Sequence, residues 1–486
     1  MSWEAALDTA RDVVSAVMGA IEVPVLVYFV VINTSYLLLI ALAAWQFVHH
    51  LRRVEQAGRE EVVGSQLAAG VSVIVPSYNE EAGIVASVQS MLALRYPRHE
   101  VVVVDDGSKD ETFTRLRDAF DLVPVDRELP RDIPVKARVL GVHVPRDGRT
   151  RLVVVRKENS GRSDAVNVGM NASSEELVVC VDADSILDPD ALLMVTQPFA
   201  DDPVRTVAAG GVIRAANGCR VLAGRVVDVR MPGTWLPRIQ VVEYLRAFLL
   251  GRAGWSRLGA LILISGAFGV FRRDVLVEVG GLDAESIGED FELVMRIHRH
   301  LRSQDRDYRV EFVAEPVCWT EVPSTTRVLS KQRARWHRGL WETLWTYRGM
   351  VANPRYGKVG LVAVPWYWLF ELIAPALELF GLVLVGLGLA LGVVHVHYAL
   401  LFLALAYGYA LLVTLAAMTV EEMSFHKYER WRDLGSTLAA AVLENVGYRQ
   451  ATAWWRLQGW WASLRGRRAV WGVMTRSGFE GERDSG

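Results

Sequence analysis

The sequence predicts an α/β domain with a mostly parallel sheet, inserted between transmembrane helices. Over residues 70–325, short Val-rich runs alternate with segments of helical periodicity, which is typical of βα units. Long, nearly uncharged apolar stretches flank this region on both sides. The Val-rich runs end in acidic residues, as in VVVVDD at 101–106 and VVCVDAD at 178–184. Carboxylates past the ends of parallel strands lie where open α/β sheets bind ligands, so a polar site is expected at that edge.

The composition excludes several classes of protein. With 486 residues, the chain is too long for one ordinary domain. Hydrophobic residues make up 51% and there are 16 Trp, which suits a membrane protein with interfacial anchors. The formal net charge of -2 gives no overall basic field, so no nucleic-acid partner is expected. The 3 Cys are scattered and form neither a disulfide framework nor a zinc set, which suits a reducing compartment.

The apolar stretches predict the membrane segments. Residues 1–22 are expected as an N-terminal amphipathic segment, and residues 23–50 as a transmembrane helix longer than the roughly 20 residues that span a bilayer. Residues 358–421 are expected as an antiparallel pair of transmembrane helices. The C-terminal region 422–486 is expected to be cytoplasmic or interfacial. Because 434–461 within it carries charges, we expect an interfacial or re-entrant segment there, with a fourth span as the alternative.

Charged residues beside the apolar stretches predict the orientation. Arg52 and Arg53 follow the first span, whereas Glu22 precedes it, and Lys427 and Arg430 follow the third span. By the positive-inside rule, the N-terminus lies outside and both the central domain and the C-terminus lie in the cytoplasm. Three spans are few for a channel, so the fourth segment, a small membrane partner subunit or a homo-oligomer is expected to complete one.

The central region reads as alternating strands and helices. The expected strands are 71–75, 101–104, 151–155 and 178–181, and the expected helices are 84–94, 112–120 and 164–170. The apolar stretch 239–255 is too short to span a membrane and is expected as an interfacial helix, with a core helix as the alternative. Residues 326–357 are expected as interfacial helices that carry the segment QRARW.

One pair of acidic residues predicts a cation site. Asp182 and Asp184 are one residue apart at the end of a strand, so both carboxylates can turn toward one divalent cation. A couple of carboxylates, completed by substrate phosphates, is the usual arrangement for Mg²⁺ or Mn²⁺. This pattern points to chemistry on a nucleoside diphosphate. The alternative is that the acidic pairs only cap the following helices.

Taken in order, the motifs resemble a known family. The segments that carry the resemblance are SVIVPSYNEE, VVVVDDGSKDET, NSGRSDAVNVGM, VCVDADS, SGAFGVFRRDVL, GLDAESIGEDFEL and QRARWHRG. Together they resemble the processive family 2 glycosyltransferases, the membrane synthases of cellulose, chitin, hyaluronan and poly-N-acetylglucosamine. The tail segments ENVGYRQ and WRLQGWW look most like bacterial poly-N-acetylglucosamine synthase-type enzymes. The implied fold of the 70–325 domain is the GT-A glycosyltransferase fold.

The resemblance implies a donor site. A UDP-sugar would bind at a set of residues after the first strands and around the acidic pairs. These residues are Pro76, Tyr78, Glu80, Asp105, Asp106, Lys157, Arg162, Asp182 and Arg335. Asp182 and Asp184 match the metal-binding DxD, and the implied cofactor is Mg²⁺ or Mn²⁺. The family commonly has Lys where Arg162 stands, although a cation of either kind suits a phosphate.

The resemblance also implies the catalytic and acceptor residues. Asp290 in GED matches the catalytic base of an inverting transfer, and Glu289 supports it; the alternative is an acidic helix N-terminus that complements the helix dipole. Gln332, Arg335 and Trp336 match QxxRW. Arg335 suits a diphosphate, and the flat Trp336 ring suits stacking on an acceptor sugar.

Other residues of the QRARW helix are expected to meet lipid headgroups. They are Arg333, His337, Arg338, Trp341 and Trp345.

The expected activity is polymerisation of a UDP-sugar, with UDP-GlcNAc as the best guess, into a β-linked polysaccharide that passes across the membrane. The expected partners are the UDP-sugar donor, the growing polysaccharide acceptor and the lipid bilayer. The expected location is the bacterial inner membrane, as a multi-pass protein. A non-processive transferase that glycosylates a lipid carrier is one alternative, and an inactive transport or receptor scaffold is another.

Overall fold

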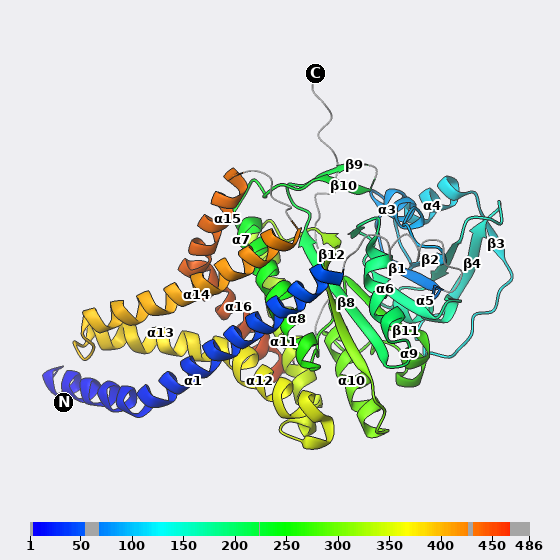
Figure 1. Cartoon of the computed structure of the whole chain (residues 1–486). Helices are drawn as coiled ribbons and strands as arrows, with labels where there is room; N and C mark the ends of the chain where they lie inside the picture. The colour runs from blue at the N-terminus through cyan, green and yellow to red at the C-terminus, as the bar shows by residue number, and fades with distance from the viewer. Residues whose placement is uncertain (1–2, 54–67, 223, 426–430, 467–486) are drawn as a thin grey trace.

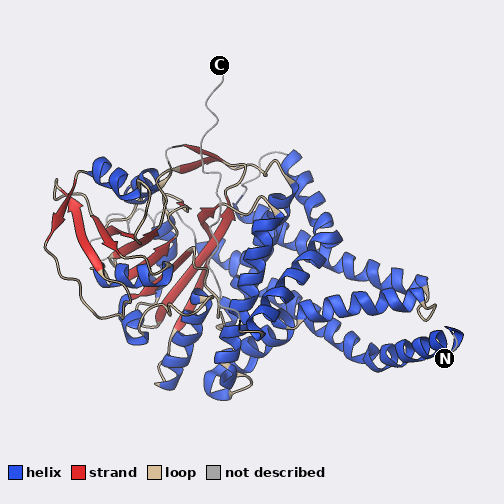
Figure 2. Ribbon diagram, turned by 180° about the vertical axis from the view of Figure 1, so that it is seen from behind, coloured by secondary structure: helices blue, strands red, loops and turns tan. Residues whose placement is uncertain are grey.

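The computed structural model describes residues 3–53, 68–222, 224–425 and 431–466. A sheet with its covering helices forms one part of the molecule, and long helices extend from it on one side (Figures 1 and 2). Lys427 and Arg430, on which the predicted orientation partly depends, lie outside the described residues.

The first part is built on one large sheet. Its strands, with the small hairpin β9–β10, are β1 (Val71–Ser77), β2 (His99–Asp105), β3 (Leu122–Val125), β4 (Val139–Pro145), β5 (Leu152–Lys157), β6 (Leu177–Val181), β7 (Ile186–Leu187), β8 (Thr206–Ala215), β9 (Arg220–Leu222), β10 (Arg225–Asp228), β11 (Phe268–Arg272) and β12 (Arg309–Thr320). The 10-stranded sheet has the order β3-β4-β5-β2-β1-β6-β11-β8-β12-β7.

The sheet is mixed, whereas the sequence predicted a mostly parallel one. β5, β2, β1 and β6 are parallel neighbours, and β8 pairs with β12 in parallel. β11 is antiparallel to both β6 and β8, and β3, β4 and β7 add antiparallel edges. Val-rich runs indicate burial on both faces but not direction. The predicted α/β fold class, an α/β domain between membrane helices, is confirmed.

Helices cover the sheet and place its polar edge. They are α3 (Ile84–Leu92), α4 (Thr112–Phe120), α5 (Arg162–Ala172), α6 (Ala191–Asp201), α9 (Arg273–Val279) and α10 (Glu289–Ser303). α5 packs on β1, β2 and β5, and α6 packs on β8 and β12. β1, β2 and β6 run parallel, so their carboxyl ends, and the acidic residues that follow, meet at one edge.

Three helical stretches are long and apolar enough to cross a membrane, among the residues described. They are Trp3–Trp45, Val359–Ala390 and Ala399–Thr419. The first belongs to α1 (Trp3–Arg53), a single helix, so the structure does not separate the expected amphipathic segment 1–22 from the span. The other stretches contain η4 (Val359–Ala363), α12 (Val364–Trp366), η5 (Tyr367–Leu372), α13 (Ala374–Ala390) and α14 (Val396–Phe425). Figure 1 shows α1, α13 and α14 projecting together from the sheet domain.

The remaining helices join the sheet to these membrane helices. They are α7 (Trp235–Leu245), η1 (Arg246–Arg252), α8 (Ala253–Leu258), α11 (Thr326–Thr346), η2 (Arg348–Met350), η3 (Pro354–Tyr356), α15 (Trp431–Leu443), η6 (Glu444–Tyr448) and α16 (Arg449–Leu464). The expected segment 434–461 is not one of the three candidate spans. The helix in this segment is interrupted at Val446 and Gly447. Gly447 has a φ of 84°, a left-handed conformation that favours glycine.

Candidate active site

One cavity of about 3210 Å³ joins the polar edge of the sheet to the membrane helices. Most of the site residues predicted from the sequence line it. These residues are Pro76, Tyr78, Glu80, Asp106, Arg162, Asp182, Asp184, Glu289, Asp290, Gln332, Arg335 and Trp336. Asp105 and Lys157 do not line it. The structure therefore brings together side chains that lie as far apart in the sequence as Pro76 and Trp336.

The loops after β1 and β2 are tied to each other at the mouth of the site. The backbone N–H of Asn79 donates to Ser108 Oγ at 3.0 Å, and the N–H of Lys109 donates to Asn79 Oδ1 at 2.9 Å. Asn79 has a φ of 57°, a left-handed conformation that asparagine tolerates. These bonds hold Tyr78, which is 40% exposed, at the cavity wall.

Lys157 is buried within the fold, whereas the family resemblance implied that it contacts the UDP-sugar donor. Its ammonium group is fully buried and ion-paired with Asp106 and with Asp164, whose carboxylate lies 3.2 Å away. Burial raises the pKa of Asp106 in spite of this pairing. Asp105 is also buried, and its Oδ1 accepts from the N–H of Ser108 at 3.0 Å. These bonds therefore stabilise the turn that follows β2. Of Asp105 and Asp106, only Asp106 lines the cavity.

Arg162, at the first position of α5, connects three parts of the site. Its Nε donates to Asp182 Oδ1 at 2.8 Å, and its Nη1 donates to Glu289 Oε1 at 3.0 Å. Its Nη2 donates to the carbonyl oxygen of Gly266 at 2.6 Å. The family resemblance suggested that Arg162 contacts phosphate. In this structure its guanidinium instead bridges Asp182 of DxD and Glu289 of GED, and so fixes the positions of these two carboxylates relative to each other.

The GED motif starts α10 and lies against α11. A Cβ on Gly288 would be 3.2 Å from the Cα of Gly339, so the two backbones meet at a pair of glycines. Asp290 Oδ2 accepts from the N–H of Gly266 at 2.9 Å. Burial raises the pKa of Glu289 to about 7, although the positive charge of Arg162 opposes the rise. The close approach of Gly288 and Gly339 places the GED motif and the QRARW helix beside the same cavity.

The QRARW residues face the same carboxylates. Burial lowers the pKa of Arg335, while the negative charges of Glu289, Asp290 and Asp182 oppose that change. Trp336 is 44% exposed and lines the cavity, as does the buried Gln332. An arginine and a flat aromatic ring therefore lie beside the acidic cluster.

Two residues of this helix correct the expectation of headgroup contacts. Arg333 and His337 are buried, whereas Trp345 is 49% exposed. Arg333 Nη2 donates to Glu243 Oε2 at 2.6 Å, and its guanidinium lies 4.7 Å from the centre of the Trp336 ring. The helix periodicity of the sequence did not show which face of the helix would be covered by distant segments.

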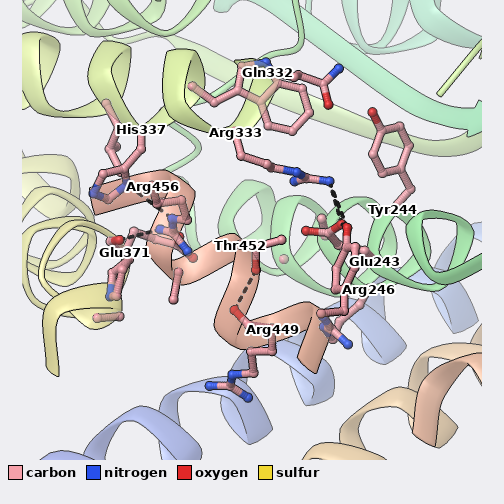
Figure 3. Close-up of a pocket in the computed structure, with 18 of the residues that line it drawn as sticks. Glu243, Tyr244, Arg246, Gln332, Arg333, His337, Glu371, Arg449, Thr452 and Arg456 are labelled. Carbon is pink, nitrogen blue, oxygen red and sulfur yellow. Dashed lines mark hydrogen bonds and ion pairs between the residues drawn. The ribbon is translucent and has the colours of Figure 1, made fainter. Parts of the chain in front are cut away.

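Ion pairs line the membrane side of the cavity, and sequence analysis missed this set. The pairs join Arg246 to Glu444, Arg333 to Glu243, Arg449 to Glu378 and Arg456 to Glu371. Figure 3 shows Arg333 bonded to Glu243, and Arg456 bonded to Glu371, among the side chains that line this pocket. The signal in the sequence was the presence of Glu371 and Glu378 within an apolar stretch, where unpaired charges are costly.

Comparisons with known proteins indicate the family of the chain. A model of the family "Glycosyl transferase family 2" matches residues 72–276, and a model of "Glycosyl transferase family group 2" matches residues 177–420. A poly-beta-1,6-N-acetyl-D-glucosamine synthase of Staphylococcus aureus strain COL is 29% identical over 280 residues, which cover 57% of this chain and 55% of that protein. The synthase of Staphylococcus epidermidis is 28% identical over 282 residues, with 57% and 56% covered. The chain thus spans about half the length of these relatives.

Solved structures are similar at lower identity. A mannosyltransferase from Pyrobaculum calidifontis, in complex with GDP-Man and Mn²⁺, has a TM-score of 0.48 and 18% identity, covering 89% of this chain and 99% of that one. Glucosyl-3-phosphoglycerate synthase from Mycobacterium tuberculosis, in complex with Mn²⁺, UDP and glucosyl-3-phosphoglycerate, has a TM-score of 0.35 and 17% identity, covering 59% and 83%.

Proposed function

The chain belongs to the family 2 glycosyltransferases, and we propose that it polymerises a UDP-sugar into a β-linked polysaccharide that passes outward between its membrane helices. The best candidate for the donor is UDP-GlcNAc, because the relatives named above are poly-beta-1,6-N-acetyl-D-glucosamine synthases. The proposed setting is the inner membrane of a bacterium, with the sheet domain in the cytoplasm.

A single observation carries the proposal. One cavity is lined both by the carboxylates at the sheet edge and by side chains of the membrane helices α1, α13 and α14. An enzyme that only modified a soluble acceptor would have no use for a cavity that continues between membrane helices. The polar lining on the membrane side, made of the four ion pairs, offers donors and acceptors to sugar hydroxyls.

Residues of the site suit a divalent cation that shares its coordination with a diphosphate. Asp182 and Asp184 both line the cavity and provide the oxygen ligands that Mg²⁺ and Mn²⁺ prefer. Among the residues described, three or more His, Cys, Asp or Glu side chains do not gather into a metal site. The two aspartates would therefore hold the cation together with donor phosphate oxygens, and the bound cation would neutralise charge on the leaving diphosphate.

The chain's own residues would divide the reaction between them. Pro76, Tyr78 and Glu80 would enclose the uridine, and Arg335 would bind the diphosphate with its planar donors. Asp290 would accept the proton of the acceptor hydroxyl as its oxygen attacks the anomeric carbon. The bond from that carbon to the diphosphate breaks as the new one forms, UDP leaves, and the configuration inverts.

Trp336 and Arg335 should fail differently when changed. Trp336→Ala removes the face on which the terminal sugar stacks, so UDP should still bind while products become short. Arg335→Ala removes a charge-assisted phosphate contact, so UDP affinity and turnover should both fall. Equal effects of the two substitutions on UDP binding would contradict this division of roles.

The test of the function is product length from purified protein in lipid, supplied separately with UDP-GlcNAc, UDP-Glc and UDP-GlcA. Long chains beside unused primer, at low enzyme concentration, would support processive polymerisation. One sugar added per acceptor would refute it and favour transfer to a lipid carrier. No incorporation from any donor would favour an inactive scaffold.

A further inference from the structure

The C-terminal helix α16 takes no part in the bond-making step proposed above, yet it lies along the QRARW helix. The model of "Glycosyl transferase family group 2" ends at residue 420, so the segments ENVGYRQ and WRLQGWW follow the matched part. α16 packs against α11 and α13. Residues from both tail segments also line the cavity, including Tyr448 and Arg456.

α16 approaches the QRARW segment closely at Gly459. A Cβ on Gly459 would lie 2.0 Å from the carbonyl oxygen of Ala334, the residue just before Arg335. A side chain of any size at this position would push the two helices apart. Further along, Ser463 Oγ donates to Glu342 Oε1 at 2.8 Å, so contact continues to the end of α11.

Arg456 connects the two helices to the membrane helix pair. Its Nε donates to Nδ1 of His337, 3.2 Å away, and its Nη2 donates to Oε2 of Glu371, also 3.2 Å away (Figure 3). Burial, with a smaller effect of Arg456, lowers the pKa of His337 to about 3, so the imidazole stays neutral and can accept this bond. Arg456 thereby fixes the residue that follows Trp336.

A second set of contacts links the tail to Trp336 through Glu243 and Arg333. Tyr448 Oη donates to Glu243 Oε2 at 2.9 Å, and Arg333 donates to the same oxygen. Arg333 in turn lies over the Trp336 ring. The Arg333 guanidinium, which Glu243 and Tyr448 hold in place, thus covers one face of the indole. Trp336 is nevertheless 44% exposed, and it lines the cavity.

We propose that the segment Glu444–Leu464 is part of the acceptor site, with Tyr448, Arg456 and Gly459 acting as positioning residues that hold Trp336 with one ring face toward the terminal sugar. This inference rests on the proposed function, because it takes the acceptor to be a sugar chain. The positioning role of the three residues is exerted through α11 and is separate from the hydrogen bonds that Arg456, as part of the cavity lining, offers to the polymer.

The first test compares Gly459→Ala with Gly435→Ala in the full-length protein. A Cβ on Gly435 of α15 meets nothing within 4 Å, so that variant controls for a glycine-to-alanine change in a helix. A displacement of about 1 Å costs on the order of a hundredfold in rate, so Gly459→Ala should lower kcat/KM for a β-linked N-acetylglucosamine pentasaccharide by about that factor. UDP affinity should remain within about twofold, and products should become short.

The second test removes a single oxygen atom. Tyr448→Phe should raise KM for the pentasaccharide by about tenfold, because a hydrogen bond to a charged group is lost. Tyr96→Phe, which loses a hydroxyl bond to the carbonyl oxygen of Ala69 at 2.7 Å, is the matched control and should leave that KM unchanged. Because Tyr448→Phe removes one oxygen atom and adds no bulk, it tests the inference even if Gly459→Ala does not fold.

The outcomes separate the inference from the function. If the wild type makes no polymer, the proposed function fails. If the wild type polymerises while Tyr448→Phe keeps both acceptor KM and product length, the inference is overturned. A parallel loss of UDP affinity in both tail variants would also overturn it, because it would mean that α16 only supports the whole fold.

Discussion

The charge of Glu289 offers a sharp test of the site geometry, because burial opposes its ionisation. The perturbation is Glu289→Gln, which keeps the shape of the side chain and imitates its protonated form. Arg162 lies 3.0 Å away, and Asp290 and Arg335 are the other charged groups that influence Glu289. In the folded protein the pKa of Glu289 is raised from 4.5 to about 7.

The magnitude and sign of the effect follow from that rise. Because the folded pKa is above the unfolded value, folding favours the protonated form, and this contribution to stability is fully present below about pH 4.5 and lost as pH rises through 7. One pH unit corresponds to about 1.4 kcal/mol, so ionisation should cost the wild type about 3 kcal/mol of unfolding free energy above pH 7. Glu289→Gln cannot ionise and should escape this loss.

The assay is thermal unfolding followed by tryptophan fluorescence, at pH values from 5.5 to 8.5, without added metal or nucleotide. The midpoint of the wild type should fall with rising pH by a few degrees more than that of Glu289→Gln. Glu285→Gln, in which the replaced side chain is 80% exposed, is the matched control and should follow the wild type. Identical pH slopes for wild type and Glu289→Gln would refute the burial argument.

Three further predictions concern Asp184, Asp290 and Lys157. Asp184→Asn should abolish sugar transfer without loss of folding, and EDTA should stop the wild type until Mn²⁺ or Mg²⁺ is added; full activity in chelator would exclude the cation. Asp290→Asn should bind UDP normally and lose roughly 10²–10⁴-fold in turnover, and a loss below about tenfold would exclude it as the base. Lys157→Met should destabilise the protein by about 3–5 kcal/mol, because Asp106 and Asp164 lose their buried partner. Normal stability with weak UDP binding would instead restore Lys157 as a phosphate contact.

Local sequence pattern was sufficient for much of the sheet domain. The Val-rich runs predicted β1, β2 and β6, and the helix expected at 112–120 is α4 (Thr112–Phe120). Parallel neighbours bring their carboxyl ends to one edge, so the acidic residues after β2 and β6 could be placed together without a structure. Direction was not readable for β11, because a buried strand is apolar whichever way it runs.

The sequence pattern could not distinguish a basic side chain that binds a ligand from one that forms a buried ion pair within the fold. Lys157 ends a strand beside the site, as a phosphate-binding residue would, yet it is fully buried between two carboxylates. Nothing in the local sequence shows that Asp164, on the following helix, turns back toward Lys157. The closing of that ion pair depends on the packing of α5 on the sheet.

The membrane side of the cavity shows why charges inside apolar segments were the missed signal. Glu371 and Glu378 stand in a stretch that would otherwise be purely apolar, and an unpaired carboxylate there is costly. Their partners, Arg456 and Arg449, lie more than seventy residues further along. These ion pairs hold the tail against the membrane helices, and α16, which supplies both arginines, also packs on α11. The half-buried Glu371 and Glu378 thus help to hold α16 beside the QRARW helix.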